Sequence, residues 1–217
     1  MMRPTIKMLL AAMLTTTPGL ASAQEGNRAA WLINVGATRL AMVDKAEVTL
    51  AGQGLASAGV KSDPQWVPSL NVTRFVKFDL GLNLSTGLPP TIKYRGAGVL
   101  ATAGPLLDVR YAAPAVTLVW SPLRARVITP YVGAGVTYMH VMATRDRGLA
   151  DATVDDDVAP VLQAGLSLFP HHRWGVFADV KKAYVRTVAR GTVAGYPSST
   201  RLQMDPTVLQ AGVALRL

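Results

Sequence analysis

The sequence predicts an all-β protein, an eight-stranded antiparallel up-and-down transmembrane β-barrel. Eight segments alternate apolar with small or polar residues, and a period of two is the period of a strand. The connections between these segments are 22, 2, 26, 7, 18, 4 and 24 residues long, so long and short alternate throughout. Outer-membrane barrels have short turns on one side and long loops on the other, whereas a soluble sandwich has no reason for this pattern. Half of the 217 residues are hydrophobic and only 16% are charged, which also favours a membrane. The eight segments are 31–43, 66–75, 78–85, 112–120, 128–142, 161–169, 174–182 and 207–217.

The first 23 residues predict a cleaved export signal. Arg3 and Lys7 provide a positive start, a short apolar run follows, and "ASA" at 21–23 has the small-x-small pattern of a signal peptidase site. The apolar run is too short for a spanning helix, which needs about 20 residues. We therefore expect two parts, a signal at 1–23 and a barrel domain at 24–217. An alternative is the core helix of a cytosolic protein.

The strands follow in order from their alternation. In 31–43 we expect Leu32, Leu40 and Met42 to point inward. The segment "FDLGLNLS" at 78–85 sets apolar residues against Asp79, Gly81, Asn83 and Ser85, and "VLQAGLSLF" at 161–169 repeats this scheme. In the uncharged "PYVGAGVTYMHV" at 130–141, Val132, Ala134, Val136 and Tyr138 should meet lipid while two glycines face a narrow interior. The last segment places Leu209, Ala211, Val213, Leu215 and Leu217 on one face.

Tryptophans and charges agree with this orientation. Trp31, Trp120 and Trp174 all lie beside the chain terminus or a short turn, as expected for an interfacial aromatic girdle. Charges of lipid-facing parity lie near the long-loop ends, where they can reach headgroups. They are Arg39, Arg110 and Lys182. An even number of strands places both ends of the mature chain in the periplasm.

Other chemistry has little support. The chain has no cysteine, which excludes a disulfide framework, and its net charge of +9 is scattered, so we expect anionic lipid and no nucleic acid. His171 and His172 on a turn, and the acidic "GLADATVDDDVAP" segment, are interpreted as solvated and not as metal sites. His140 is the one strand histidine, but no serine–histidine–carboxylate set can be assembled around it. We expect no cofactor, no metal and no enzymatic activity.

The sequence resembles the OmpW family of small outer-membrane proteins, in particular its AlkL-like members. The residues that carry the resemblance are "PYVGAGVTY" at 130–138, "PPT" at 89–91, "PAVTLVW" at 114–120 and "LQMDPTVLQAGVALRL" at 202–217. The resemblance implies a narrow eight-stranded barrel with an apolar interior, and we expect a monomer. It also implies insertion by the barrel-assembly machinery, which in this family reads a C-terminal aromatic residue where this chain has Leu217. Its members are thought to help small hydrophobic molecules cross the lipopolysaccharide leaflet and leave sideways through the wall.

The inward parity suggests which residues would serve such transport. We expect a substrate pathway formed by Leu32, Leu40, Met42, Met139, Val141 and Phe177, although these side chains would equally fill a small lumen. We expect a polar plug formed by Asp79, Asp179, Lys181 and Arg216, because buried charges of opposite sign need each other. Pro114 and Pro130 cannot donate a ladder hydrogen bond, so they mark either a lateral exit or simply strand starts.

The leading hypothesis is a passive conduit for small hydrophobic molecules across the outer membrane. The second hypothesis is a structural or surface-interaction barrel that binds lipopolysaccharide or host ligands and transports nothing. It would use basic loop residues, which are Lys45, Lys61, Arg95, Arg145 and Arg147. The third is a rim enzyme that acts on lipid.

Overall fold

The computed structural model describes residues 30–42, 45–50, 53–54, 58–123, 126–147, 150–170, 173–193 and 196–217. The predicted export signal and the pair His171–His172 lie outside this part of the chain. Within the described residues, no helix is long and apolar enough to cross a membrane.

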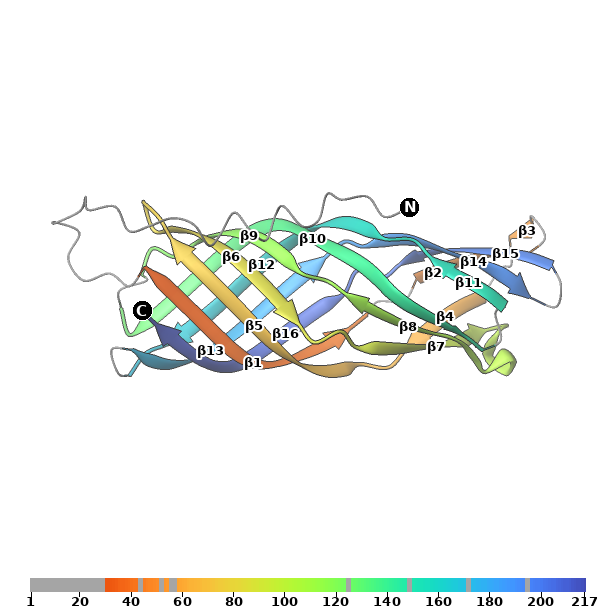
Figure 1. Cartoon of the computed structure of the whole chain (residues 1–217), viewed down its shortest axis with the longest axis horizontal. Coiled ribbons are helices and arrows are strands. Elements are labelled where there is room, and N and C mark those ends of the chain that lie inside the picture. The colour runs from red at the N-terminus through yellow and green to blue at the C-terminus, as the bar shows by residue number, and fades with distance from the viewer. Residues whose placement is uncertain are drawn as a thin grey trace.

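Eight antiparallel strands close into a barrel (Figure 1). Neighbours in the sequence of barrel strands are neighbours in space, the last strand returns beside the first, and the pairing of Leu32 with Arg216 and of Ala41 with Thr207 completes the wall. Each strand overlaps one predicted segment, so the predicted fold class is confirmed. The barrel strands are β1 (Trp31–Ala41), β5 (Gln65–Phe75), β6 (Leu80–Gly87), β9 (Ala115–Trp120), β10 (Ile128–Asp146), β12 (Asp157–Leu168), β13 (Trp174–Ala183) and β16 (Thr207–Arg216).

The alternation places a continuous apolar surface on the outside of the barrel. Val132 and Val136 of β10 are exposed outward, while Tyr131, Thr137 and Met139 of the same strand are buried inside. Closure leaves no open strand edge, as a hydrocarbon environment requires. Exposed apolar side chains on the other barrel strands include Val35, Leu70, Leu82, Leu118, Leu162, Val176, Leu209 and Val213.

The two ends of the barrel differ. At one end, which we call the short-turn end, residues 76–79, 121–127 and 169–173 connect the strands, and β1 begins and β16 ends there. Trp31, Trp120 and Trp174 lie at this end, as the sequence predicted. We call the opposite end the long-hairpin end; Trp66 is 68% exposed near it, opposite Arg39 of β1.

Above the long-hairpin end, the wall continues as two additional sheets (right side of Figure 1). The sequence predicts loops here, but most of these residues form strands. The first sheet continues from the end of β10 in the order β10-β8-β7-β4, and the second has the order β11-β14-β15-β2-β3. Together we call them the extension. Its strands are β2 (Lys45–Leu50), β3 (Gln53–Gly54), β4 (Ala58–Ser62), β7 (Thr91–Gly98), β8 (Pro105–Ala112), β11 (Ala150–Val154), β14 (Arg186–Val193) and β15 (Tyr196–Gln203), with a 3-10 turn at Ala101–Ala103.

The narrow barrel demands glycine where strands approach each other. A Cβ at Gly135 of β10 would overlap the carbonyl oxygen of Val116 on β9. A Cβ at Gly165 of β12 would overlap the ring of Tyr131, which lies across it from β10. Gly135 therefore permits the close approach of β9 and β10, and Gly165 leaves room for the Tyr131 ring in the lumen.

Candidate functional site

The middle of the lumen is filled by a hydrogen-bonded network that we call the polar plug. All eight barrel strands contribute to it, and every member is buried. Because polar groups removed from water must find partners inside, such a set is stable only when its members satisfy one another. Its members are Thr38, Asn71, Thr73, Asn83, Thr117, Tyr131, Gln163, Asp179, Lys181 and Gln210.

Asp179 is the centre of the polar plug. Asp179 and Lys181 are two residues apart on β13, so they share a face, and Lys181 Nζ donates to Asp179 Oδ1 at 2.6 Å. Asp179 Oδ2 accepts from Tyr131 Oη at 2.8 Å and from Gln163 Nε2 at 2.7 Å. The carboxylate therefore has one positive and two neutral donors, which compensate its loss of water.

Two glutamines extend the polar plug across the lumen. Gln210 Oε1 accepts from Lys181 Nζ, and Gln210 Nε2 donates to Thr38 Oγ1 at 2.8 Å. On the opposite side, Gln163 Oε1 accepts from Thr117 Oγ1 at 2.7 Å. These bonds join adjacent or next-adjacent strands, and with those of Asn71 and Asn83 they form one connected network that involves all eight strands in the middle of the lumen.

An apolar cluster fills the lumen on the short-turn side. It contains two residues of the predicted pathway, Leu32 and Phe177, together with Phe75, Val119, Tyr131, Phe169 and Ala214. Arg216 closes this end: its guanidinium carbon lies 3.7 Å from the centroid of the Phe169 ring, and Nη2 donates to Thr129 Oγ1 at 2.8 Å.

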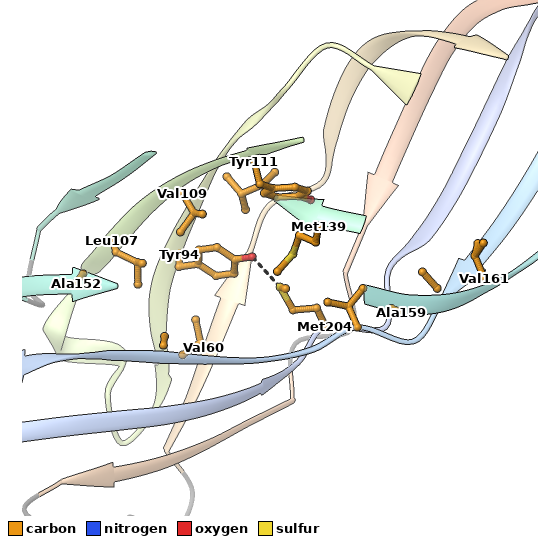
Figure 2. Close-up of a cluster of buried hydrophobic side chains, with 14 of the residues drawn as sticks. Val60, Tyr94, Leu107, Val109, Tyr111, Met139, Ala152, Ala159, Val161 and Met204 are labelled. Atoms are coloured by element: carbon orange, nitrogen blue, oxygen red, sulfur yellow. Dashed lines mark hydrogen bonds between the residues drawn. The ribbon is translucent and has the colours of Figure 1, made fainter. Parts of the chain in front are cut away.

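A second apolar cluster, which we call the upper cluster, lies on the long-hairpin side (Figure 2). Tyr94 of β7 points across the interior, and its hydroxyl donates to Met204 Sδ at 3.2 Å. The same hydroxyl lies 3.4 Å from Met42 Sδ. Side chains from the barrel and from the extension meet here, including Val60, Ile92, Leu107, Val109, Tyr111, Met139, Ala159, Val161 and Val185.

A cavity of about 110 Å³ lies between the polar plug and the upper cluster. Lys181 and Gln210 of the polar plug form its polar side. Most of its remaining lining is apolar or weakly polar, and three methionines contribute, Met42, Met139 and Met204. Methionine is flexible and adapts to ligands of different shape. The arrangement suits a small apolar molecule, or one with a single polar end.

The cavity reaches an interruption in the barrel wall. β6 and β9 are paired from Leu80–Trp120 to Ser85–Ala115. The segment that follows β6 and the segment that precedes β9 pair again only from Thr91–Arg110 onward, as β7 and β8. Between these points, residues 86–90 face residues 111–114 without a ladder, and both edges line the cavity. We call this interruption the seam. Pro89, Pro90 and Pro114 lie along it and have no N–H to contribute to a ladder.

The structure divides the predicted pathway residues between two levels. Leu40, Met42 and Met139 line the cavity, and Val141 packs against the upper cluster. Leu32 and Phe177 instead lie in the short-turn cluster, on the other side of the polar plug. The alternation along each strand shows that all six side chains point inward. It does not show at which level along the barrel axis each of them lies.

The predicted plug residues also separate. Asp179 and Lys181 contact each other as expected, whereas Arg216 has its own partners at the short-turn end. Asp79 does not point from a strand into the lumen. It lies in the turn before β6 with φ of 59°, half-buried, and its carbonyl oxygen accepts from Ser121 N–H. The predicted strand began two residues too early, because the turn conformation of Phe78 and Asp79 is not visible in the alternation.

The two predicted exit prolines lie far apart. Pro114 borders the seam, and its carbonyl oxygen accepts from Tyr138 N–H. Pro130 pairs with Leu166 near the short-turn end, within an intact part of the wall. Pro89 and Pro90 lie on the opposite edge of the seam, near its upper end, where pairing resumes at Thr91–Arg110. The sequence does contain this information, since "PP" within a strand-like stretch marks a break in a ladder.

Five residues of the site were not predicted from the alternation: Tyr94, Tyr111, Met204, Gln163 and Gln210. Gln163 and Gln210 lie on inward parity, and an inward glutamine in an apolar strand would have indicated the polar plug. Tyr94, Tyr111 and Met204 belong to segments interpreted as loops, so no inward face was assigned to them. The alternation of Ile92 and Tyr94 with charged neighbours was the available indication.

His140 has a carboxylate partner on the outer surface. Asp156 Oδ2 lies 2.8 Å from His140 Nδ1 and accepts from Tyr138 Oη at 2.7 Å, while Asp156 Oδ1 accepts from Val141 N–H at 2.8 Å. Partial burial acts to raise the pKa of the Asp156 carboxyl, but these hydrogen bonds outweigh it, and the net pKa is lowered. Asp155 pairs with Arg190 at 2.7 Å, so the acidic segment orders the base of the extension. In the described ranges, no three His, Asp or Glu side chains gather as metal ligands.

The model of the OmpW family matches residues 27–217. The chain belongs to the OmpW family. Among the relatives of this OmpW-family barrel, the dibenzothiophene metabolism operon protein PahQ of Pseudomonas aeruginosa is 26% identical over 194 residues, which is 89% of this chain and 92% of the relative. Outer membrane protein AlkL of Ectopseudomonas oleovorans is 24% identical over 168 residues, 77% of this chain and 73% of the relative.

Solved structures agree on the fold. The outer membrane protein OprG from Pseudomonas aeruginosa superposes with a TM-score of 0.81 at 18% identity, covering 88% of this chain and 98% of OprG. AlkL in lipid bilayers superposes with a TM-score of 0.71 at 22% identity, covering 93% and 97%. The OmpW-family chain is therefore a bacterial outer-membrane β-barrel, and its outward apolar surface contacts lipid.

Proposed function

We propose that this barrel allows passive uptake of small hydrophobic molecules across the outer membrane, with lateral exit through the seam. In this proposal the long-hairpin end faces the outside, and the short-turn end and both ends of the mature chain face the periplasm. A monomer is sufficient, and the process requires no cofactor and no catalysis.

The observation that carries the proposal is the cavity with a polar floor and an interrupted wall. A solute that reaches the cavity meets the polar plug below it, where an apolar molecule would have to break buried hydrogen bonds to continue. The seam beside it leads to lipid through a stretch where no ladder needs to be broken. Passage from the cavity into lipid lowers the free energy of an apolar molecule, because it stays away from water. Direct entry into the aqueous periplasm does not lower it.

The entrance to the cavity would pass the upper cluster. Tyr94 and Met204 meet above the cavity, so a solute from outside has to displace this contact. A hydrogen bond to a thioether is weak, and the methionine side chain has several accessible rotamers. The contact can therefore open for a small solute without disturbing the strands.

The relatives support an apolar solute. One relative is named for a dibenzothiophene metabolism operon, and dibenzothiophene is an apolar aromatic compound. The similarity to AlkL supports the same class of function. At these identities, the lateral exit rests on the seam of this chain and not on the relatives.

The test is solute flux into lipid vesicles that contain the purified mature protein. An apolar probe should enter faster than into protein-free vesicles, and a polar sugar of similar size should not. Met139→Asp places a charge in the cavity and should slow the apolar probe strongly. Phe177→Leu alters the lumen below the polar plug and should leave the rate unchanged, provided that both variants are folded. Rapid sugar influx would contradict the blocked lumen.

The alternative function is a structural or surface-interaction barrel that transports nothing. The extent of the upper cluster favours it, because this cluster packs the lumen above the cavity in the state described by the structure. Absence of flux for both probes through folded protein would support this alternative.

A further inference from the structure

The outer face of the first extension sheet carries an unusual concentration of positive charge. Lys93 and Arg95 of β7 and Arg110 of β8 point outward, because the residues between them, such as Ile92, Tyr94 and Val109, are buried inward. We call the set the basic face. It consists of Lys61 on β4, Lys93 and Arg95 on β7, Arg110 on β8, and Arg145 and Arg147 at the end of β10.

The strand register brings these cations close together. Lys61 is directly opposite Arg95. Lys93 and Arg145 flank Asp108 from the two neighbouring strands. Since neighbouring strands are about 4.8 Å apart and alternate residues about 7 Å apart, the six cations occupy a patch on the order of 15 Å wide.

The acidic groups on this face do not neutralise it. Asp108 is buried and is already bound by Arg147, with Nη2 at 2.9 Å and Nε at 3.2 Å. Asp63 lies 3.8 Å from Arg95, and both side chains are well exposed, so this pair is weak. Within the described residues, Lys61, Lys93, Arg110 and Arg145 have no ion pair. Like charges on neighbouring strands repel, and a bound polyanion would remove that cost.

The position of the basic face relative to the membrane identifies the anion. Along β10, the outward side chains change from Val136 and Tyr138 in the apolar belt to Arg145 in the extension, and Arg147 follows directly after the strand. Arg110 pairs with Thr91 directly above the seam and lies beside Ala143. The first cations therefore lie at the height where the headgroups of the outer leaflet meet water, if the long-hairpin end faces outside as in the proposed function.

We propose that the basic face binds the phosphate groups of a phosphorylated glycolipid of the outer leaflet. Guanidinium groups bind phosphate oxygens in pairs, and lysine adds point charge. The acyl chains of a lipid held in this way lie along the apolar belt below, next to the seam. The bound lipid then shields the six cations and fixes the level of the barrel in the leaflet.

The experiment measures binding of lipid A to the folded full barrel in neutral detergent by native mass spectrometry. Three ligands are compared: bis-phosphorylated lipid A, the same lipid without phosphates, and inorganic phosphate. The test variant is Lys93→Gln/Arg110→Gln. The matched control, Arg186→Gln/Arg201→Gln, removes two exposed cations from the second extension sheet. Retained heat-modifiable migration shows that each variant is folded.

We expect bis-phosphorylated lipid A to bind to wild type and to the control with similar affinity, and at least tenfold more weakly to the test variant. The dephosphorylated lipid should bind weakly to all three proteins, and inorganic phosphate should not replace the lipid at equal concentration. Equal affinity of both lipids, equal loss in both variants, or no loss in the test variant would overturn the proposal. The assay contains no transported solute, so its outcome is independent of the flux experiment.

Discussion

Ser85 of β6 and Ala115 of β9 form the last backbone pair below the seam. Immediately above this pair the backbone ladder between the two strands stops, and pairing resumes only between Thr91 and Arg110. The adjacent ladders extend further: β5 pairs with β6 as far as Ser69–Gly87, and β10 pairs with β8 at His140–Ala112. The β5–β6 ladder ends there, and pairing of these two segments resumes at Ser62–Tyr94, between β4 and β7. The wall therefore opens lowest between β6 and β9, directly beside the cavity, and this is where the proposed lateral exit lies.

The polar plug makes a prediction about stability. Lys181→Met leaves Asp179 buried with only neutral donors, and breaking one side of a buried ion pair costs about 3–5 kcal/mol of unfolding free energy. Urea unfolding in lipid vesicles, followed by tryptophan fluorescence, should reveal this loss. Lys77→Met in the exposed turn before β6 is the control and should change stability by less than about 0.5 kcal/mol. Equal effects of the two substitutions would mean that the ion pair does not stabilise the barrel.

A second prediction concerns the close approach of β9 and β10. Gly135→Ala forces a methyl group into the backbone of Val116, so the strands must separate or fail to pair. Overpacking of this kind costs about 1–3 kcal/mol or more, and folding yield should fall sharply. Gly59→Ala in β4 is the matched control, since its Cβ would have only ordinary contacts with Ala97, the nearest at 3.6 Å. The fraction with heat-modifiable migration measures both.

The upper cluster makes a third prediction. Tyr94→Ala removes the ring that lies above the cavity, so the apolar probe should enter vesicles several times faster. The barrel should also lose about 3–5 kcal/mol of stability, as for other buried aromatic residues. Tyr94→Phe retains the ring and should have wild-type flux. An unchanged rate in a folded Tyr94→Ala variant would place the entrance elsewhere.

The fourth prediction is a pH dependence at Asp156. Its folded pKa lies below the ordinary carboxyl value because of the hydrogen bonds from His140, Val141 and Tyr138. A lowered folded pKa means that the stabilisation is present above the unfolded pKa and is lost as the pH falls through the folded pKa. The amide resonance of Val141, which donates to this carboxylate, should therefore shift only at acidic pH, with a midpoint below the ordinary carboxyl pKa. Asp156→Asn should abolish the transition, and a midpoint above the ordinary value would contradict the account.

The eight barrel strands were predictable because hydrocarbon enforces a strict alternation. Val132 faces lipid and its neighbour Gly133 faces the narrow lumen. Because these two environments accept different residues, the two faces of each strand are visible in the sequence. The extension was not predicted, because Lys93 and Arg95 face water there and their charges are typical of loops. Only the inward partners, such as Ile92 and Tyr94, retain the alternation.

The candidate site was predicted in its chemistry but not in its arrangement. Asp179 and Lys181 are two residues apart on one strand, so the alternation places them on the same face, and their opposite charges then predict an ion pair. The alternation does not show that Leu32 and Leu40 lie on opposite sides of the polar plug, since height along a tilted barrel depends on the stagger between strands. The seam depends on where two ladders end, which no single segment reveals.

The most direct test is to close the seam in a chain that has no cysteine of its own. Cysteines at Thr86 and Ala113, one on each edge, are joined by a short bifunctional thiol reagent that can later be cleaved. The control joins cysteines at Val35 and Val213, which are paired, outward-facing and part of the intact wall. The account predicts that apolar uptake stops on joining Thr86→Cys to Ala113→Cys, returns on cleavage, and is unaffected in the control. Undiminished uptake through a fully joined seam would contradict lateral exit at this position.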